Sequence, residues 1–129
     1  MSTRVLQTLS MALLGACGIV ALYAPEVFLG AINMANVTPH WPVQLLASAW
    51  LGLATLNWST RGFTMGGILG RPVVLANFAH YFIAAMCTVR PVLAGGRPGP
   101  LTVLVVFGLL AAAYGYLLFA RTPGAPTAS

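Results

Sequence analysis

Four apolar runs, each 18–20 residues long, constrain the fold of this chain more than any other feature of its sequence. They cover residues 5–24, 43–60, 72–89 and 101–120. A helix of about 20 apolar residues crosses the hydrocarbon core of a bilayer, which is roughly 30 Å thick. Because lipid offers the backbone no hydrogen-bond partners, segments that lack strand alternation must span it as helices. The sequence therefore predicts an all-α membrane protein, a bundle of four transmembrane helices.

The charges agree with a membrane address. Charged residues make up 5% of the chain, against about 25% in soluble domains. The net charge of +5 comes from six arginines and one acid, Glu26. The arginines stand singly between apolar runs, so they favour membrane-edge anchors over a nucleic-acid interface. We expect residues 1–121 to form one domain and residues 122–129 a disordered tail.

The arginines also predict the orientation. The N-terminus, the second loop and the C-terminus share one side and hold four of them, Arg4, Arg61, Arg71 and Arg121. The other two loops hold Arg90 and Arg97. Because positive charge is retained in the cytoplasm, both termini are predicted there, in the inner (plasma) membrane of a bacterium. Trp41 and Trp58 flank the helix 43–60 at about 26 Å, which places Asn57 and Arg61 at the membrane interface.

The segment Asn77-Phe78-Ala79-His80-Tyr81-Phe82 puts polar groups inside the third apolar run. Asn77, His80 and Tyr81 share one helix face, and Thr55 and Tyr114 fall within a turn of the depth of His80. We predict a polar intramembrane cluster of these five residues, with neutral His80 hydrogen-bonded to Thr55 or Tyr114. A structural role is favoured over a proton relay or solute site, because Glu26 at a membrane edge is the chain's only carboxylate residue.

Other side chains suggest packing and give no reaction. Glu26 and Arg90 fall at the same membrane edge, as an ion pair or as two independent charges. Cys17 and Cys87 lie at similar depths; free thiols are favoured, with a disulfide left open. The sequence Leu14-Gly15-Ala16-Cys17 resembles a lipoprotein cleavage site, but the chain stays apolar beyond it, so a first transmembrane helix is favoured.

Catalytic and cofactor motifs are missing. The chain contains no aspartate and hence no Ser/His/Asp set, and its cysteines lack metal-ligand spacing. His40 and His80 differ in depth by roughly 10 Å, which argues against bis-histidine haem ligation. We therefore predict no metal and no cofactor. Gly108, Ala112 and Gly115 give the helix 101–120 a small-residue face, suited to packing within the monomer or to self-association.

Three segments resemble a group of small uncharacterised bacterial four-helix membrane proteins. They are YAPEVFLG at the end of the first helix, LLASAWLGLATLNWSTRG in the second and LANFAHYF in the third. The similarity extends from about Leu13 to Phe119. It departs from the group in a second loop without mixed charges and in Arg90 at the end of the third helix. The resemblance implies a fold and a membrane location, and no reaction.

Three classes of function remain open. The first is a non-enzymatic membrane protein that packs with other chains, as an accessory subunit or a homo-oligomer, and it is favoured. The second is a small solute or proton transporter or channel that uses the polar stripe of the helix 72–89. The third is a membrane enzyme or redox module, for which no catalytic residue can be named. Nucleic acid is not an expected partner, whereas membrane lipid is.

Overall fold

The computed structural model describes residues 3–62, 70–95 and 98–120. Within these ranges the chain is helical and contains no strand. Its helices are α1 (Thr3–Tyr23), α2 (Pro25–Ala31), α3 (Trp41–Thr60), α4 (Gly70–Leu93) and α5 (Pro98–Ala120). The predicted all-α class is confirmed, and α2 is an addition to the four predicted helices. The tail that we expected to be disordered lies outside the described residues.

Three of these helices are long and apolar enough to cross a membrane. They are Thr3–Tyr23, Gly70–Leu93 and Pro98–Phe119, among the residues that the structure describes. The helix α3 has 20 residues, which is enough length, but it does not meet the same hydropathy condition. Its sequence WPVQLLASAWLGLATLNWST contains six side chains with hydroxyl or amide groups. A membrane protein is therefore supported, while the count of four crossings is not established.

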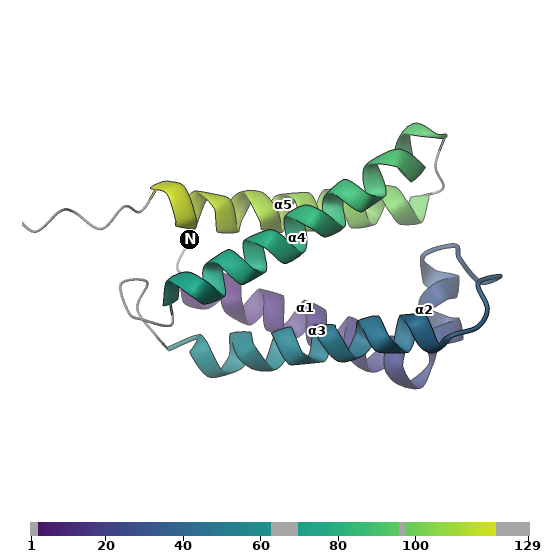
Figure 1. Cartoon of the computed structure of the whole chain (residues 1–129), viewed down its shortest axis with the longest axis horizontal. Helices are drawn as coiled ribbons and strands as arrows, with labels where there is room; N and C mark the ends of the chain where they lie inside the picture. The colour runs from purple at the N-terminus through teal and green to yellow at the C-terminus, as the bar shows by residue number, and fades with distance from the viewer. Residues whose placement is uncertain (1–2, 63–69, 96–97, 121–129) are drawn as a thin grey trace, which may run out of the picture.

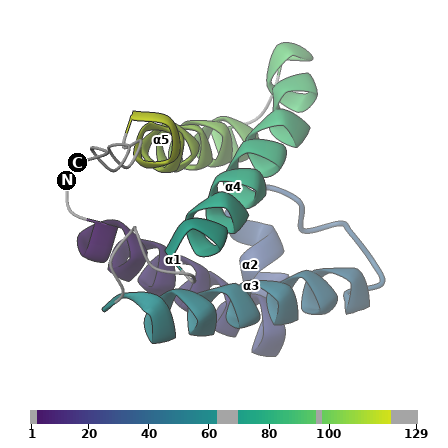
Figure 2. The ribbon, with the colours of Figure 1, turned by 60° about the vertical axis from the view of Figure 1, so that its left-hand side comes forward.

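The four long helices form two hairpins. Helix α1 packs along α3, and α4 packs along α5, while α4 is steeply inclined to α1 and α3 (Figure 2). The first hairpin is tight because Gly18 leaves room for the neighbouring helix. A Cβ at this position would lie 2.9 Å from Leu51 Cγ and 3.3 Å from the Ala47 carbonyl oxygen. The start of α1 and the end of α5 lie at the same end of the molecule (Figure 1).

Helix α2 exists because Pro25 interrupts the first apolar run. Proline lacks an N–H and disrupts a continuing helix, but it is well suited to the first position of a new one. Helix α2 ends in a Schellman motif: Asn33 adopts a left-handed backbone with φ 59°, its N–H donates to Gly30 O at 3.1 Å, and Met34 N–H donates to Leu29 O at 2.7 Å. The chain then turns toward α3.

Helix α2 packs at the end of the bundle opposite to the termini. Its Phe28 ring contacts the Trp50 ring of α3 edge-on, with centroids 5.5 Å apart. Leu29 is buried as well. The first turn of α5 passes so close to α2 that a Cβ on Gly99 would overlap the backbone carbonyl of Ile32. A short helix thus joins α3 and α5 at this end.

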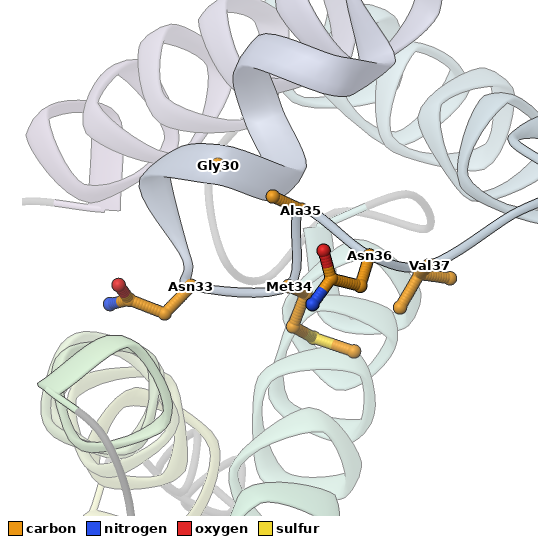
Figure 3. A pocket seen from close by; sticks show the side chains of 6 residues that line it. All are labelled: Gly30, Asn33, Met34, Ala35, Asn36 and Val37. Atoms are coloured by element: carbon orange, nitrogen blue, oxygen red, sulfur yellow. The ribbon is translucent and has the colours of Figure 1, made fainter.

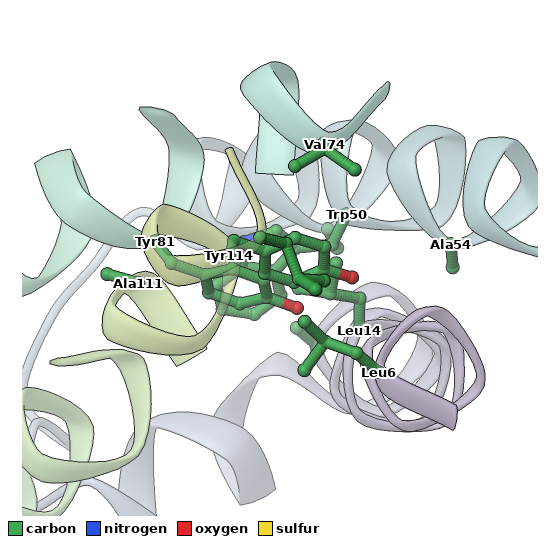
Figure 4. Close-up of a cluster of buried hydrophobic side chains, with 11 residues drawn as sticks. Leu6, Leu14, Trp50, Ala54, Val74, Tyr81, Ala111 and Tyr114 are labelled. Carbon is green, nitrogen blue, oxygen red and sulfur yellow. The ribbon is translucent and has the colours of Figure 1, made fainter. Parts of the chain in front are cut away.

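The core lies between the two hairpins, and all four long helices contribute to it. Its largest fully buried side chains are Tyr81 of α4 and Tyr114 of α5, whose rings stack with centroids 5.8 Å apart. Both rings extend toward Leu6 and Leu14 of α1 (Figure 4). Aromatic side chains therefore fill the space that the inclination of α4 leaves between the hairpins.

Candidate functional site

Two buried asparagines join the hairpins. Asn57 Nδ2 of α3 donates to Asn77 Oδ1 of α4 at 2.8 Å, and Asn77 Nδ2 donates back to Asn57 Oδ1 at 2.9 Å. Each Nδ2 also donates to the carbonyl oxygen four residues earlier, that of Leu53 at 3.0 Å and that of Val73 at 2.9 Å. Both side chains are 0% exposed. All four amide N–H groups are thereby used inside the protein.

The remaining two long helices reach the same place. Tyr114 of α5 donates its hydroxyl hydrogen to Ser10 Oγ of α1 at 2.9 Å, and the Tyr114 oxygen lies 3.5 Å from Asn57 Oδ1. One turn away, Gln7 Nε2 donates to Thr60 Oγ1 at 3.4 Å. We call these side chains the buried polar cluster: Gln7, Ser10, Asn57, Thr60, Asn77 and Tyr114.

This cluster includes some of the predicted residues and omits others. Asn77 and Tyr114 belong to it, and Tyr81 stacks on Tyr114. Thr55 does not approach them: its side chain is exposed and its hydroxyl donates to Leu51 O of its own helix at 2.9 Å. His80 is half-buried, and its ring lies against Tyr81 and Phe107. The hydrogen bond expected from His80 to Thr55 or Tyr114 is not among its contacts.

Asn57 corrects an expectation. We placed it at the membrane interface beside Arg61, but its side chain is buried against Asn77. Ala47, Trp50, Ala54 and Asn57 recur every three or four residues and are all buried, so Asn57 follows the buried face of α3. Arg61 does lie at the surface, with its guanidinium carbon 3.2 Å from the Trp58 ring centroid.

Sequence reasoning also missed Gln7 and Ser10. Both lie on the buried face of α1, which repeats with helical period through Leu6, Leu14 and Gly18. The available signal was a pair of polar residues three apart on the same face of an otherwise apolar helix. Their polarity was overlooked because neither residue is ionisable.

Four buried polar atoms have no hydrogen-bond partner in the described residues. They are Gln7 Oε1, Trp50 Nε1, His80 Nε2 and the Tyr81 hydroxyl. The Tyr81 side chain is 0% exposed, so water cannot reach it from the surface. Burying such a group without a partner costs free energy. The packing of the helices does not explain why these four polar atoms are buried.

The other predicted features are separate. Glu26 and Arg90 are both exposed residues of the described part of the chain, and the structure records no ion pair between them. Cys17 and Cys87 are free thiols, as favoured. Among the described residues, no three His, Cys, Asp or Glu side chains gather in a group that could hold a metal ion.

Two surface concavities are open to the outside. The turn after α2 forms one of about 430 Å³ (Figure 3), lined by Gly30, Asn33, Met34, Ala35, Asn36 and Val37. It offers two amides and no nucleophile or titratable group. The other, which we call the α4–α5 groove, has about 400 Å³ and an apolar lining. It includes Phe78, Phe82 and Met86 of α4 and Gly108, Ala112 and Phe119 of α5.

The predicted small-residue face of α5, Gly108, Ala112 and Gly115, lines this groove. A Cβ on Gly115 would lie 3.1 Å from the Phe78 ring, whereas a Cβ on Gly108 would meet nothing within 4 Å.

Comparisons with models of protein families, with curated proteins and with solved structures give no match. The resemblance to small bacterial four-helix membrane proteins thus stays a prediction. Any function has to be inferred from the geometry described above.

Proposed function

We propose that this protein is a non-enzymatic integral membrane protein that packs in the bilayer against a second copy of itself, through the uncovered face of α3. We place it in a bacterial inner membrane with α3 as a fourth crossing and both termini in the cytoplasm. The observation that carries this proposal is the contrast of α3 with the other long helices. It is the long helix that falls short in hydropathy, and 11 of its 20 residues are exposed.

The uncovered surface has a composition suited to another helix. We call one stripe of it the α3 outer face, formed by Ser48, Gly52, Thr55 and Ser59; the exposed side chains of Leu45 and Leu56 belong to the same surface of the helix. All four are exposed, and they recur at intervals of four, three and four residues, the spacing of a helix–helix seam. A Cβ on Gly52 would meet nothing within 4 Å. Small residues allow close helix approach in membranes. The three hydroxyls donate their hydrogens to carbonyl oxygens of α3 itself, so toward another helix they can act as hydrogen-bond acceptors.

The buried polar cluster supports a packing role over chemistry. Its asparagine amides donate to each other and to backbone carbonyls, so no donor of that pair is left for a substrate. Two-fold dimers are the commonest assemblies and use one self-complementary face. The α3 outer face, placed along a single helix, can meet its own copy in this way.

A Gly52→Leu variant tests the proposal. Leucine would fill the closest approach of two α3 helices, so we expect the dimer dissociation constant to rise at least about tenfold, since 1.4 kcal/mol of lost packing corresponds to that factor. Analytical ultracentrifugation in mild detergent and energy transfer between labelled copies in liposomes measure it. Gly108→Leu is the matched control, because this glycine also faces open space but on α5.

The results separate the possibilities. A wild-type chain that stays monomeric in both media, or a Gly52→Leu variant that dimerises normally, contradicts the proposal. If a different chain co-purifies in fixed ratio and is lost in Gly52→Leu, the partner is an accessory one.

Transport is a second candidate, supported by His80 Nε2 and the Tyr81 hydroxyl, which are buried without partners. A relay through α4 would need water or a solute at these atoms. Proton flux into liposomes would then fall in His80→Ala but persist in Thr102→Val, whose exposed side chain donates only to Pro98 O of its own helix.

A further inference from the structure

We propose that the α4–α5 groove binds one anionic phospholipid, with an acyl chain in the groove and the headgroup at Arg71. This inference is independent of dimerisation through α3, which uses the opposite hairpin. It assigns a binding site for one lipid molecule, distinct from the bulk lipid that surrounds the protein.

The groove has the shape and surface that an acyl chain requires. It holds about 400 Å³, and its lining is apolar, with Phe82 on one wall and Gly108 in the floor. The lining extends along α5 from Leu104 to Phe119, about 22 Å at 1.5 Å per residue. One leaflet contributes roughly 15 Å of the hydrocarbon core. The acyl chain of a lipid in one leaflet is therefore short enough for its whole length to lie in the groove.

Arg71 extends the same surface to the headgroup region. On α4, residues 71, 75, 78 and 82 are separated by four, three and four positions, so they form one stripe along the helix. Phe78 and Phe82 line the groove, while Arg71 and Leu75 are exposed beyond it. Arg71 stands in the first turn of α4, at the end of the bundle where α1 begins and α5 ends.

The positive charge at the end of the bundle where α4 begins favours an anionic headgroup. Arg4 and Arg61 lie at the same end as Arg71, since Gln7 of α1 contacts Thr60 of α3 there. The only acid of the chain, Glu26, is in the first turn of α2, at the other end. No Asp or Glu side chain therefore competes for these guanidinium groups. Arginine pairs with phosphate oxygens through a fork of N–H donors, and each basic residue at a membrane surface favours anionic lipid.

Binding of defined lipids to the purified chain tests the site. Native mass spectrometry would compare dioleoylphosphatidylglycerol with dioleoylphosphatidylcholine, which share their acyl chains and differ in headgroup charge. We expect the wild type to bind phosphatidylglycerol about fivefold more tightly, the factor that one basic residue contributes. Arg71→Gln should remove this preference. Arg90→Gln, an exposed arginine at the other end of the same helix, should retain it.

The groove is tested separately from the headgroup. Gly108→Leu places a side chain in the floor, and we expect both lipids to bind about tenfold more weakly, because several buried CH₂ contacts are lost. Ala112→Leu, at an exposed position of the same lining, provides a second variant if the first does not fold. Gly52→Leu is the control: it should lose dimerisation and keep lipid binding.

Each alternative outcome contradicts one part of the proposal. Equal affinity for the two lipids, or equal behaviour of Arg71→Gln and Arg90→Gln, removes the headgroup assignment. Unchanged lipid binding in folded Gly108→Leu and Ala112→Leu removes the groove. Conversion of a dimer to a monomer by Gly108→Leu, with Gly52→Leu still dimeric, assigns the groove to a second copy and overturns both this inference and the proposed dimer face.

Discussion

The α1–α3 hairpin and the α4–α5 hairpin share a plan of two long helices, but different forces hold each together. In the first, Gly18 brings the backbones close, and side-chain hydrogen bonds join Gln7 to Thr60 and Gln44 Nε2 to Leu22 O. In the second, aromatic rings of α4 contact rings of α5: Phe78 contacts Phe119, and Tyr81 contacts Phe107 and Tyr114. None of the side-chain hydrogen bonds between described residues joins α4 to α5.

The outer surfaces of the two hairpins also differ in polarity. Helix α3 exposes Gly52 and hydroxyl groups among large apolar side chains such as Leu45, whereas α4 and α5 expose mainly large apolar side chains such as Phe82 and Phe119. In lipid, apolar side chains gain little from leaving the bilayer, while hydroxyls and close backbones favour another helix. This difference is the basis on which we propose protein contact for the first hairpin and lipid contact for the second.

The largest expected effect is on close packing in the first hairpin. Gly18→Val places two methyl groups where a Cβ alone would lie 2.9 Å from Leu51 Cγ, and such overpacking costs about 3 kcal/mol. The free energy of unfolding, from SDS titration in mixed micelles, measures this cost. Gly108→Val is the matched control, for which we expect a change of about 0.5 kcal/mol or less. Equal losses would remove the packing difference between the hairpins.

A smaller effect is expected at the joint between the hairpins. Asn77→Leu leaves the Asn57 amide buried without its partner, which costs about 2 kcal/mol. Removing both partners is less costly than removing one, so Asn57→Leu/Asn77→Leu should be more stable than the sum of the two single variants predicts. The same SDS titration gives the coupling energy of the pair. Additive losses would show that the two amides do not depend on each other.

The smallest effect concerns a single hydrogen bond at the end of α1. Leu22 O is a carbonyl that the break before Pro25 leaves to be satisfied from outside the helix, and Gln44 Nε2 donates to it at 3.2 Å. Gln44→Leu should cost about 1 kcal/mol. Thr102→Val is the control in the second hairpin, because its hydroxyl donates to Pro98 O within α5. A loss in the control as large as in Gln44→Leu would contradict the contrast.

Seven of the eight predicted helix ends lie within three residues of those observed. The prediction that Arg90 ends the helix 72–89 is wrong, because α4 continues through Arg90 and Pro91 to Leu93. Helix α3 ends at Thr60 as expected, and α4 begins two residues before Pro72. Helix α2 was not predicted, since Pro25 and Glu26 indicate the end of the first helix and the residues after them were expected to form part of a loop. Its length is too short for helical periodicity, and only the packing of Phe28 and Leu29 indicates its role.

The polar site was predictable in part. Depth predicted that Thr55 and Tyr114 would lie near the polar face of Asn77, His80 and Tyr81, and Asn77 and Tyr114 do belong to the buried polar cluster. Depth gave the wrong residue of α3, Thr55, because a shift of two residues along a helix turns a side chain by about 200°. Asn57, two positions further, has the buried orientation. Depth from helix rise is accurate to about a turn, whereas contact requires the angle around the helix axis.

The sequence by itself determined the helical class, the membrane setting and the three most apolar helices, because these depend on run length and composition. Only the tertiary structure decided the division into two hairpins, the Asn57–Asn77 pair and the faces that remain uncovered. Those features depend on the inclination of α4 and on contacts between residues far apart in the chain. Apolar residues that surround a helix on all sides do not specify which side meets a neighbour.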